Sequence, residues 1–288
     1  MTFETIAGIE ALSDTAQPIG FDIVRATGWS HLGLISDGDT WFRDRNVYAY
    51  FDRLIDDGFF EDFDQVLFYG AGPCGYAAAA FSVASPGATV LAIQPQATLD
   101  PRVAGWDDRY RHMRRTSFTD RYGYAPDMLD AADRAFVIFD PHERLDSMHA
   151  ALFTRSNATK LRVPHLGSAI ETDLFEMQML YRLIVQACSG KLSADGFYAL
   201  WRARRDHPPY LRALMHRLDS ADRPYLLAAL CRNVIARRPG PRFRRRLDAL
   251  EAQAERGEIT LPPDPAARQQ DPASDVSGAG KNTGGDSD

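Results

Sequence analysis

Cysteine is scarce in this sequence, and its spacing excludes the folds that depend on it. The three cysteines, Cys74, Cys188 and Cys231, lie far apart and form no CxxC pair and no Cys/His ligand pattern. Disulfide frameworks and structural zinc sites need several such residues at short, regular spacings. We therefore expect three reduced thiols, no disulfide and no metal site.

Long apolar runs are also lacking. The most apolar stretch, 76–93, is interrupted by Ser82, Ser85, Pro86 and Gly87, whereas a membrane-spanning helix needs about 20 predominantly apolar residues. The first twelve residues have neither the basic start nor the continuous apolar stretch of a secretory signal. These absences predict a protein without a membrane span, with the cytoplasm as its default location.

The remaining pattern is typical of a globular α/β protein. Of the 288 residues, 45% are hydrophobic and 25% are charged, which is enough to bury a full core. Short apolar runs at 31–36, 66–69, 89–93, 135–139 and 160–163 have the length of buried strands, and helical patterns separate most of them. Such alternation predicts a three-layer, mostly parallel sheet with helices on both faces.

The segments differ in character along the chain. Residues 1–20 carry little signal, and we expect the α/β domain to cover 21–190, with one amphipathic helix over 171–188. A helical appendage over 191–260 and a disordered tail over 261–288, which has almost no large apolar residues, would follow. Fourteen arginines against six acids between Trp201 and Arg256 make the appendage basic, although the whole chain has a net charge of -6. Because the remainder is acidic and no recognition motif is visible, we do not expect a nucleic-acid partner.

The chain is organised around a glycine-rich turn, in which Gly70, Gly72 and Gly75 satisfy G-x-G-x-x-G between a predicted strand and a predicted helix. In dinucleotide-binding proteins such glycines let the backbone approach a pyrophosphate at the helix N-terminus. One interpretation is therefore an oxidoreductase that binds FAD or NAD(P). The acidic residue that would hold the ribose hydroxyls after the next strand is replaced here by Gln94.

A second interpretation rests on the longer segment FYGAGPCGYAAAAFS, which resembles the nucleophile-elbow segment of a bacterial α/β-hydrolase-like family. The resemblance covers roughly 32–183 and implies an α/β-hydrolase-like arrangement. In active members a serine occupies the turn between strand and helix, a later acid orients a histidine, and that histidine activates the serine.

The sequence departs from this pattern at the nucleophile. Gly72 stands where the serine belongs and Cys74 stands where a second small residue belongs. For the acid, the resemblance leaves Asp140, Glu143 or Asp146 open. For the base it indicates His165, or a position that Ser168 occupies. Since glycine cannot form an acyl-enzyme, we expect a degenerate, non-hydrolytic protein, a pseudoenzyme in which Asp140 and His165 are vestigial and Cys74 is a buried thiol.

The resemblance also suggests a biological context. The stretches PGATVLAIQPQATLDPRVAGWDDRY and FTDRYGYAPDM resemble a group of alphaproteobacterial proteins that are sometimes labelled phosphoadenosine phosphosulfate reductase. Neither the pyrophosphate loop nor the reactive cysteine of that chemistry is present here. The leading expectation is a binding or accessory role in cell-envelope or polysaccharide processes. Its partner would be a small molecule or a protein.

A long polar and aromatic insertion separates two predicted strands at 97–131. Insertions of this kind usually cover one end of a sheet. We expect its charged residues 107–110 to form surface ion pairs, with an anion-binding lid as the alternative. Isolated histidines such as His149 are expected to be structural.

Overall fold

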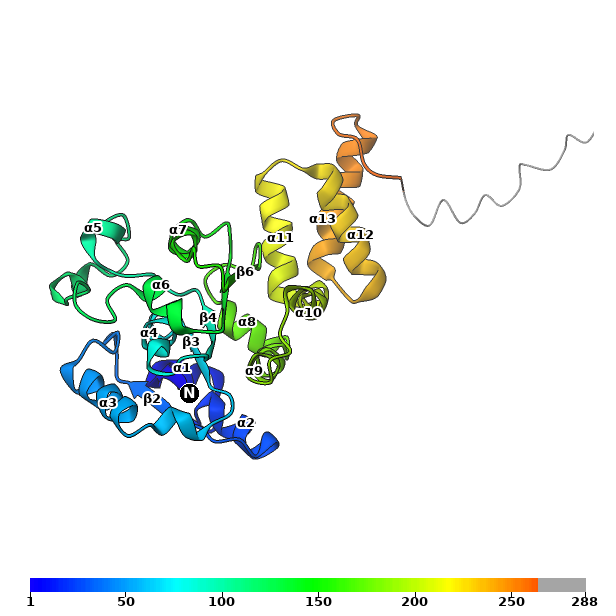
Figure 1. The fold of residues 1–288 in the computed structure, drawn as a ribbon. Helices are drawn as coiled ribbons and strands as arrows, with labels where there is room; N and C mark the ends of the chain where they lie inside the picture. Colours follow the sequence, from blue (N-terminus) through cyan, green and yellow to red (C-terminus); the bar gives the residue numbers. More distant parts are fainter. Residues whose placement is uncertain (264–288) are drawn as a thin grey trace, which may run out of the picture. The chain divides into compact units, whose positions relative to one another are not determined.

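The computed structural model describes residues 1–263 and divides into two compact units, Met1–Ala213 and a second unit that begins at Leu214. The first unit holds a six-stranded, all-parallel sheet with helices on both faces, which confirms the predicted three-layer architecture (Figure 1). The strands are β1 (Thr2–Thr5), β2 (Gly33–Ser36), β3 (Leu67–Ala71), β4 (Thr89–Ile93), β5 (Arg134–Phe139) and β6 (Ala158–Arg162).

The helices connect the strands and continue beyond the sheet. In the first unit they are α1 (Ile6–Leu12), α2 (Ile19–Thr27), α3 (Arg45–Asp56), α4 (Pro73–Phe81), α5 (Pro101–Ala104), α6 (Ala125–Met128), α7 (Arg144–Leu152), α8 (Ile170–Glu176), α9 (Leu180–Cys188) and α10 (Ala194–Leu200). Helix α11 (Pro208–Ser220) crosses the boundary between the units, and α12 (Pro224–Arg237) packs against α13 (Pro241–Glu255) in the second. Within 1–263 no helix combines the length and the apolarity that a membrane span requires.

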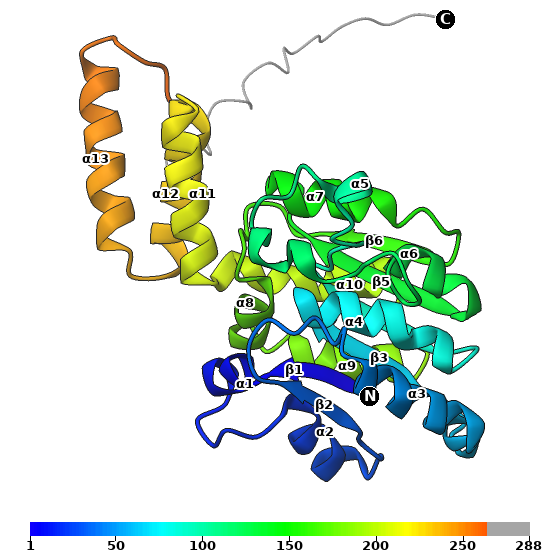
Figure 2. The same ribbon diagram turned by 90° about the vertical axis from the view of Figure 1, so that its left-hand side faces the viewer.

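The order of the strands is β2-β1-β3-β4-β5-β6 (Figure 2). The direction of winding therefore reverses between β1 and β3, as in doubly wound sheets, where ligands typically bind beyond the carboxyl ends of the strands. Helix α4 packs on one face and α9 on the other (Figure 1). The glycine-rich turn joins β3 to α4 and so lies beside the reversal.

The core on the α4 face is dominated by aromatic rings. Phe3 of β1 lies within 6.5 Å, between ring centroids, of Phe42, Phe51, Phe68 and Phe81. Helix α4 itself is fully buried along Tyr76 to Phe81 because alanines let it approach the sheet closely. Helix α4 and the strands β3 and β4 under it are short, continuous apolar segments, which is why the sequence indicated them.

Three expected boundaries are wrong. The α/β domain does not begin at residue 21, because β1 lies inside the sheet between β2 and β3. The expected helix over 171–188 is broken into α8 and α9, and Gln178 between them has a φ of +57°. The second unit begins at Leu214 rather than at 191. The expected disordered tail, from 264 onward, lies outside the described residues.

Candidate functional site

Gly72 forms the apex of the turn between β3 and α4. Its φ of 56° and ψ of -124° are a conformation that side-chain-bearing residues rarely adopt. A Cβ built on Gly72 would meet no other atom within 4 Å. The turn is therefore sharp and open above its apex, the geometry in which a nucleophile elbow presents its side chain.

The other two glycines of the motif are explained by packing. A Cβ on Gly70 would lie 2.2 Å from the carbonyl oxygen of Cys74, and a Cβ on Gly75 would lie 2.9 Å from that of Ile93. Both glycines let α4 approach the sheet without collision. Two of the three glycines in G-x-G-x-x-G thus have a structural reason that needs no dinucleotide.

Pro73 follows the apex as the first residue of α4. In hydrolase elbows the backbone N–H of the residue after the nucleophile is one of the donors that stabilise the oxyanion. Proline has no N–H. The turn consequently has neither that donor nor a nucleophilic side chain at its apex.

Asp140 and His165 lie on the same carboxyl edge of the sheet, after β5 and β6. The two carboxylate oxygens of buried Asp140 accept the backbone N–H groups of His142 (2.9 Å) and Gly167 (2.8 Å). The ring of His165 stacks on that of His142, with centroids 4.0 Å apart. Asp140 therefore fastens the two loops that follow β5 and β6, and both of its oxygens are engaged with backbone.

Gln94 follows β4 and is committed to an internal network. Its side-chain amide donates to Asp146 of α7 over 2.8 Å, and the other oxygen of Asp146 accepts from Arg109 over 2.6 Å. Under the dinucleotide interpretation this position would offer an acceptor to a ribose, but here it is an amide bonded to a buried carboxylate. Asp146, one of the acids that the hydrolase resemblance left open, is used structurally.

The same network continues to a fully buried Asp107–His149 pair. Asp107 accepts from Arg109 at 2.8 Å and contacts His149 Nε2 at 2.9 Å. His149 Nδ1 accepts the N–H of Ala97 at 3.1 Å, so Nε2 carries the proton and donates to Asp107. Because both ring nitrogens are occupied, His149 is structural, as expected, and it is not placed to act as a base.

These contacts correct the expectation of surface ion pairs for Asp107 and Arg109, whereas exposed Asp108 does form one, with Arg111 at 3.2 Å. Burial alone would raise the pKa of Asp107, but hydrogen bonds from His149 and Arg109 outweigh it and hold that pKa well below the ordinary value. The insertion over 97–131 is thus fastened to α7 by a buried polar network. Sequence reasoning missed it because bonded partners in this network lie up to 52 residues apart.

Arg43 forms a second anchor of this insertion. Its side chain is 1% exposed and donates to the carbonyl of Ser117 (3.0 Å), the carbonyl of Arg121 (2.9 Å) and the hydroxyl of Tyr76 (3.2 Å), and it also pairs with Asp120. Arginine suits this position because its fork of donors can satisfy several acceptors at once. Arg43 therefore ties the segment between β2 and α3 to α4 and to the insertion.

A largely buried acid, Glu171, lies on the face of the sheet opposite to α4. The hydroxyl of Tyr69 in β3 donates to Glu171 of α8. Burial, reinforced by the charge of Glu4, raises the pKa of Glu171 to about 7 even though the hydrogen bond from Tyr69 opposes the shift. Burial likewise raises the pKa of the Cys74 thiol, which is 5% exposed, so this thiol remains protonated and does not serve as a nucleophile.

One group of side chains could hold a metal ion. Donor atoms of Asp173, Glu176 and His207 lie within 4.8 Å of one another. However, His207 Nε2 already contacts Asp173 at 2.7 Å. A single hydrogen bond therefore accounts for the buried position of the imidazole.

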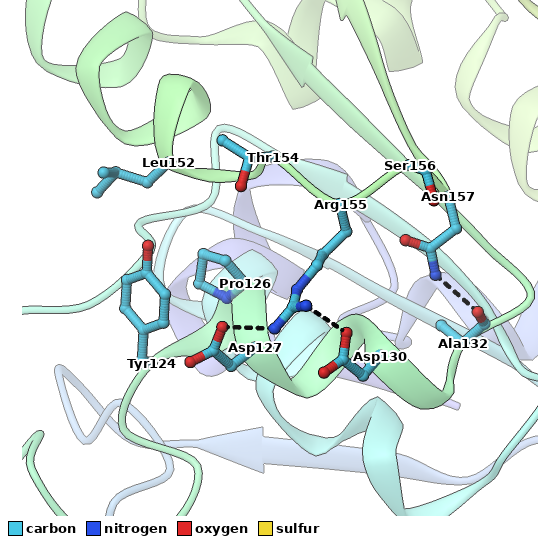
Figure 3. Close-up of a pocket in the computed structure, with 10 residues that line it drawn as sticks. All are labelled: Tyr124, Pro126, Asp127, Asp130, Ala132, Leu152, Thr154, Arg155, Ser156 and Asn157. Atoms are coloured by element: carbon cyan, nitrogen blue, oxygen red, sulfur yellow. Dashed lines mark hydrogen bonds and ion pairs between the residues drawn. The ribbon is translucent and has the colours of Figure 1, made fainter.

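A polar hollow of about 630 Å³ lies beside the amino ends of β5 and β6 (Figure 3). Arg155 reaches between Asp127 and Asp130, at 2.8 and 2.9 Å, and Asn157 donates to the carbonyls of Leu129 and Ala132. The charged groups in it are thus paired with each other, and none of them is directed at a missing ligand.

Comparisons with protein-family models, with curated proteins and with solved structures found no match to this chain.

Proposed function

We propose that this protein is a non-hydrolytic binding protein built on an α/β-hydrolase-like sheet. The observation that carries the proposal is the turn at Gly72, which has the backbone of a nucleophile elbow but neither a nucleophilic side chain nor, at Pro73, the N–H of an oxyanion hole. The strand order, with the turn beside the reversal of winding, agrees with it.

The surrounding groups support the loss of catalysis. A working triad needs an acid that orients a base and a base that contacts the nucleophile. Both carboxylate oxygens of Asp140 accept backbone N–H groups of two loops. Cys74, which lies two residues beyond the apex, is a buried thiol whose pKa is raised by burial.

Ester hydrolysis tests this proposal directly. We expect the wild-type chain to hydrolyse p-nitrophenyl acetate and butyrate no faster than the His165→Ala variant does. Gly72→Ser should not restore turnover, because Pro73 still provides no N–H to an oxyanion. Wild-type hydrolysis that is lost in His165→Ala would overturn the claim of inactivity.

The alternative is a flavin or nicotinamide oxidoreductase, and a second measurement distinguishes it from the proposed binding protein. Purified protein should show no flavin absorbance band and should bind neither FAD nor NAD(P)H in equilibrium dialysis. The engagement of Gln94 with Asp146 supports this expectation. A stoichiometric flavin would replace the proposal with the oxidoreductase interpretation.

The ligand of the binding role is proposed from the resemblance alone and belongs to cell-envelope or polysaccharide processes. Saturable binding of the full chain to isolated cell-envelope polysaccharide, with dextran as the control, would support that association. Equal retention by both polymers would reject the association with cell-envelope polysaccharide. The ester assay would then still decide whether the protein is non-hydrolytic.

A further inference from the structure

A largely apolar hollow of about 790 Å³ opens at the other end of the sheet from the glycine-rich turn. It lies beside the first residues of β1 and β3 and is closed by α2, by the segment before β2 and by the end of α9. Small-molecule sites typically have volumes of about 300–1,000 Å³ and mostly apolar walls with a few polar groups. The size of the hollow fits a small organic molecule.

Its walls are aromatic and aliphatic and are only partly covered. Ile23, Val24, Trp29, Phe59, Phe63 and Ile184 all line it. Of these, Val24, Trp29, Phe59 and Phe63 keep intermediate exposure. When an apolar molecule displaces water from such a concave apolar surface, the free energy of the system falls, and this favours binding.

His31 is a polar group in the wall whose hydrogen bonding can be assigned. The hydroxyl of Thr2 donates to Glu4 over 2.6 Å, so it must accept from His31 Nε2, which lies 2.9 Å away. This assignment places the ring proton on Nε2 and leaves Nδ1 as an acceptor with no partner among residues 1–263. Burial also lowers the pKa of His31, which keeps the ring neutral at pH 7.

Charged groups give the hollow no strong preference for an ion. Lys191 and Asp64 both line it and both are exposed, so one charge of each sign lies at its rim. The amino group of Met1, which also lines it, donates to the carbonyl of Leu67 at 2.6 Å, and burial lowers its pKa to about 6. An uncharged ligand with a hydrogen-bond donor matches the apolar walls and the acceptor nitrogen better than a carboxylate or an amine does.

We propose that this hollow binds an uncharged apolar molecule that carries a hydroxyl group, with the hydroxyl donating to Nδ1 of His31. A phenol with a short alkyl chain meets both requirements. The site is separate from the turn at Gly72 and depends on no assumption about hydrolysis.

Isothermal titration of the full chain with 4-butylphenol tests the proposal, with 4-butylanisole as the matched ligand without a donor. We expect saturable binding of the phenol with a stoichiometry of one, and about tenfold weaker binding of the methyl ether, the factor that one hydrogen bond contributes. The phenol should also bind more tightly than 4-butylbenzoate. No binding, or equal binding of phenol and ether, would overturn the proposal.

Three variants locate the site. Val24→Trp should fill the hollow and abolish binding, whereas Arg25→Ala on the exposed side of the same helix should leave it unchanged. His31→Phe keeps a ring of similar size but removes both ring nitrogens and with them the Nδ1 acceptor, so the preference for phenol over ether should disappear.

Circular dichroism checks that the variants fold. If Val24→Trp does not fold, the His31→Phe comparison decides the result. Binding that survives in a folded Val24→Trp, or a preference that survives in His31→Phe, would refute the assignment. Because the ester assay concerns the opposite end of the sheet, either proposal can fail without the other.

Discussion

Replacing Glu171 with glutamine should remove a pH-dependent destabilisation from the first unit. The carboxyl group is buried, accepts the Tyr69 hydroxyl and lies in the field of Glu4, and its pKa is raised from an ordinary 4.5 to about 7. The folded protein therefore favours the protonated, neutral form. Glutamine copies that neutral form at every pH.

The sign and the magnitude follow from linkage between folding and protonation. Because the pKa of Glu171 is higher in the folded state, its contribution to stability is fully present below about pH 4.5 and is lost as the pH rises through about 7. At about 1.4 kcal/mol for each pKa unit, the full difference approaches ~3 kcal/mol. Glu171→Gln should thus gain up to ~3 kcal/mol relative to wild type between pH 4.5 and pH 8.

Urea unfolding followed by tryptophan fluorescence measures this difference. The four tryptophans, Trp29, Trp41, Trp106 and Trp201, all lie in the first unit, so the signal reports that unit. Other groups titrate in the same range, but they are present in both proteins and cancel in the comparison.

Exposed Glu61 provides the matched control, and Glu61→Gln should show the wild-type pH dependence. If the stability curves of wild type and Glu171→Gln ran parallel from pH 4.5 to pH 8, the reasoning about the buried carboxyl would be wrong.

Five further substitutions, in three comparisons, test the turn and the anchors of the insertion by the same unfolding assay. Gly70→Ala should destabilise the first unit by more than ~3 kcal/mol, because its Cβ would meet a backbone oxygen at 2.2 Å. The Cβ of Gly72→Ala meets open space, so this variant should lose only ~1–3 kcal/mol of stability, from its positive φ. Equal losses in the two variants would contradict this reasoning. Asp107→Asn should lose ~2–3 kcal/mol of stability at pH 7, because the ionised carboxylate holds the buried network. This loss should shrink as the pH falls below 3.8, the ordinary pKa of the group. An unchanged urea midpoint in the variant would disprove the role of the carboxylate. Arg43→Ala should lose ~3–5 kcal/mol, against less than ~1 kcal/mol for the half-exposed Arg121→Ala, and similar losses would show that Arg43 is no anchor.

Local sequence pattern was sufficient wherever a segment is short, apolar and buried. The run at 89–93 matches β4 residue for residue, and the run at 135–139 is β5 without its first residue. Strands of a covered parallel sheet are apolar on both faces, so they stand out against polar connections. The predicted helical appendage contains α12 and α13, each of which begins at a proline, a residue that is favoured at the first position of a helix.

The same reasoning failed where a segment depends on distant partners. Strand β1 has one large apolar residue, Phe3, between Thr2 and Glu4, and its polar side chains are satisfied by groups outside the strand, including the N–H of Ile19 at 2.9 Å. The break between α8 and α9 at Gln178 has no glycine or proline to announce it. Neither feature has a local signal strong enough to read.

The same distinction between local and distant determinants applies to the candidate site. The sequence by itself determined the chemistry of the turn, because Gly72 lacks a side chain and Pro73 lacks an N–H in any fold. Only the tertiary structure decided what Asp140, Asp107 and Glu171 do, since their burial and several of their hydrogen-bond partners come from segments that lie tens of residues away. Backbone chemistry is a property of each residue, whereas the protonation and pairing of a side chain are set by its surroundings.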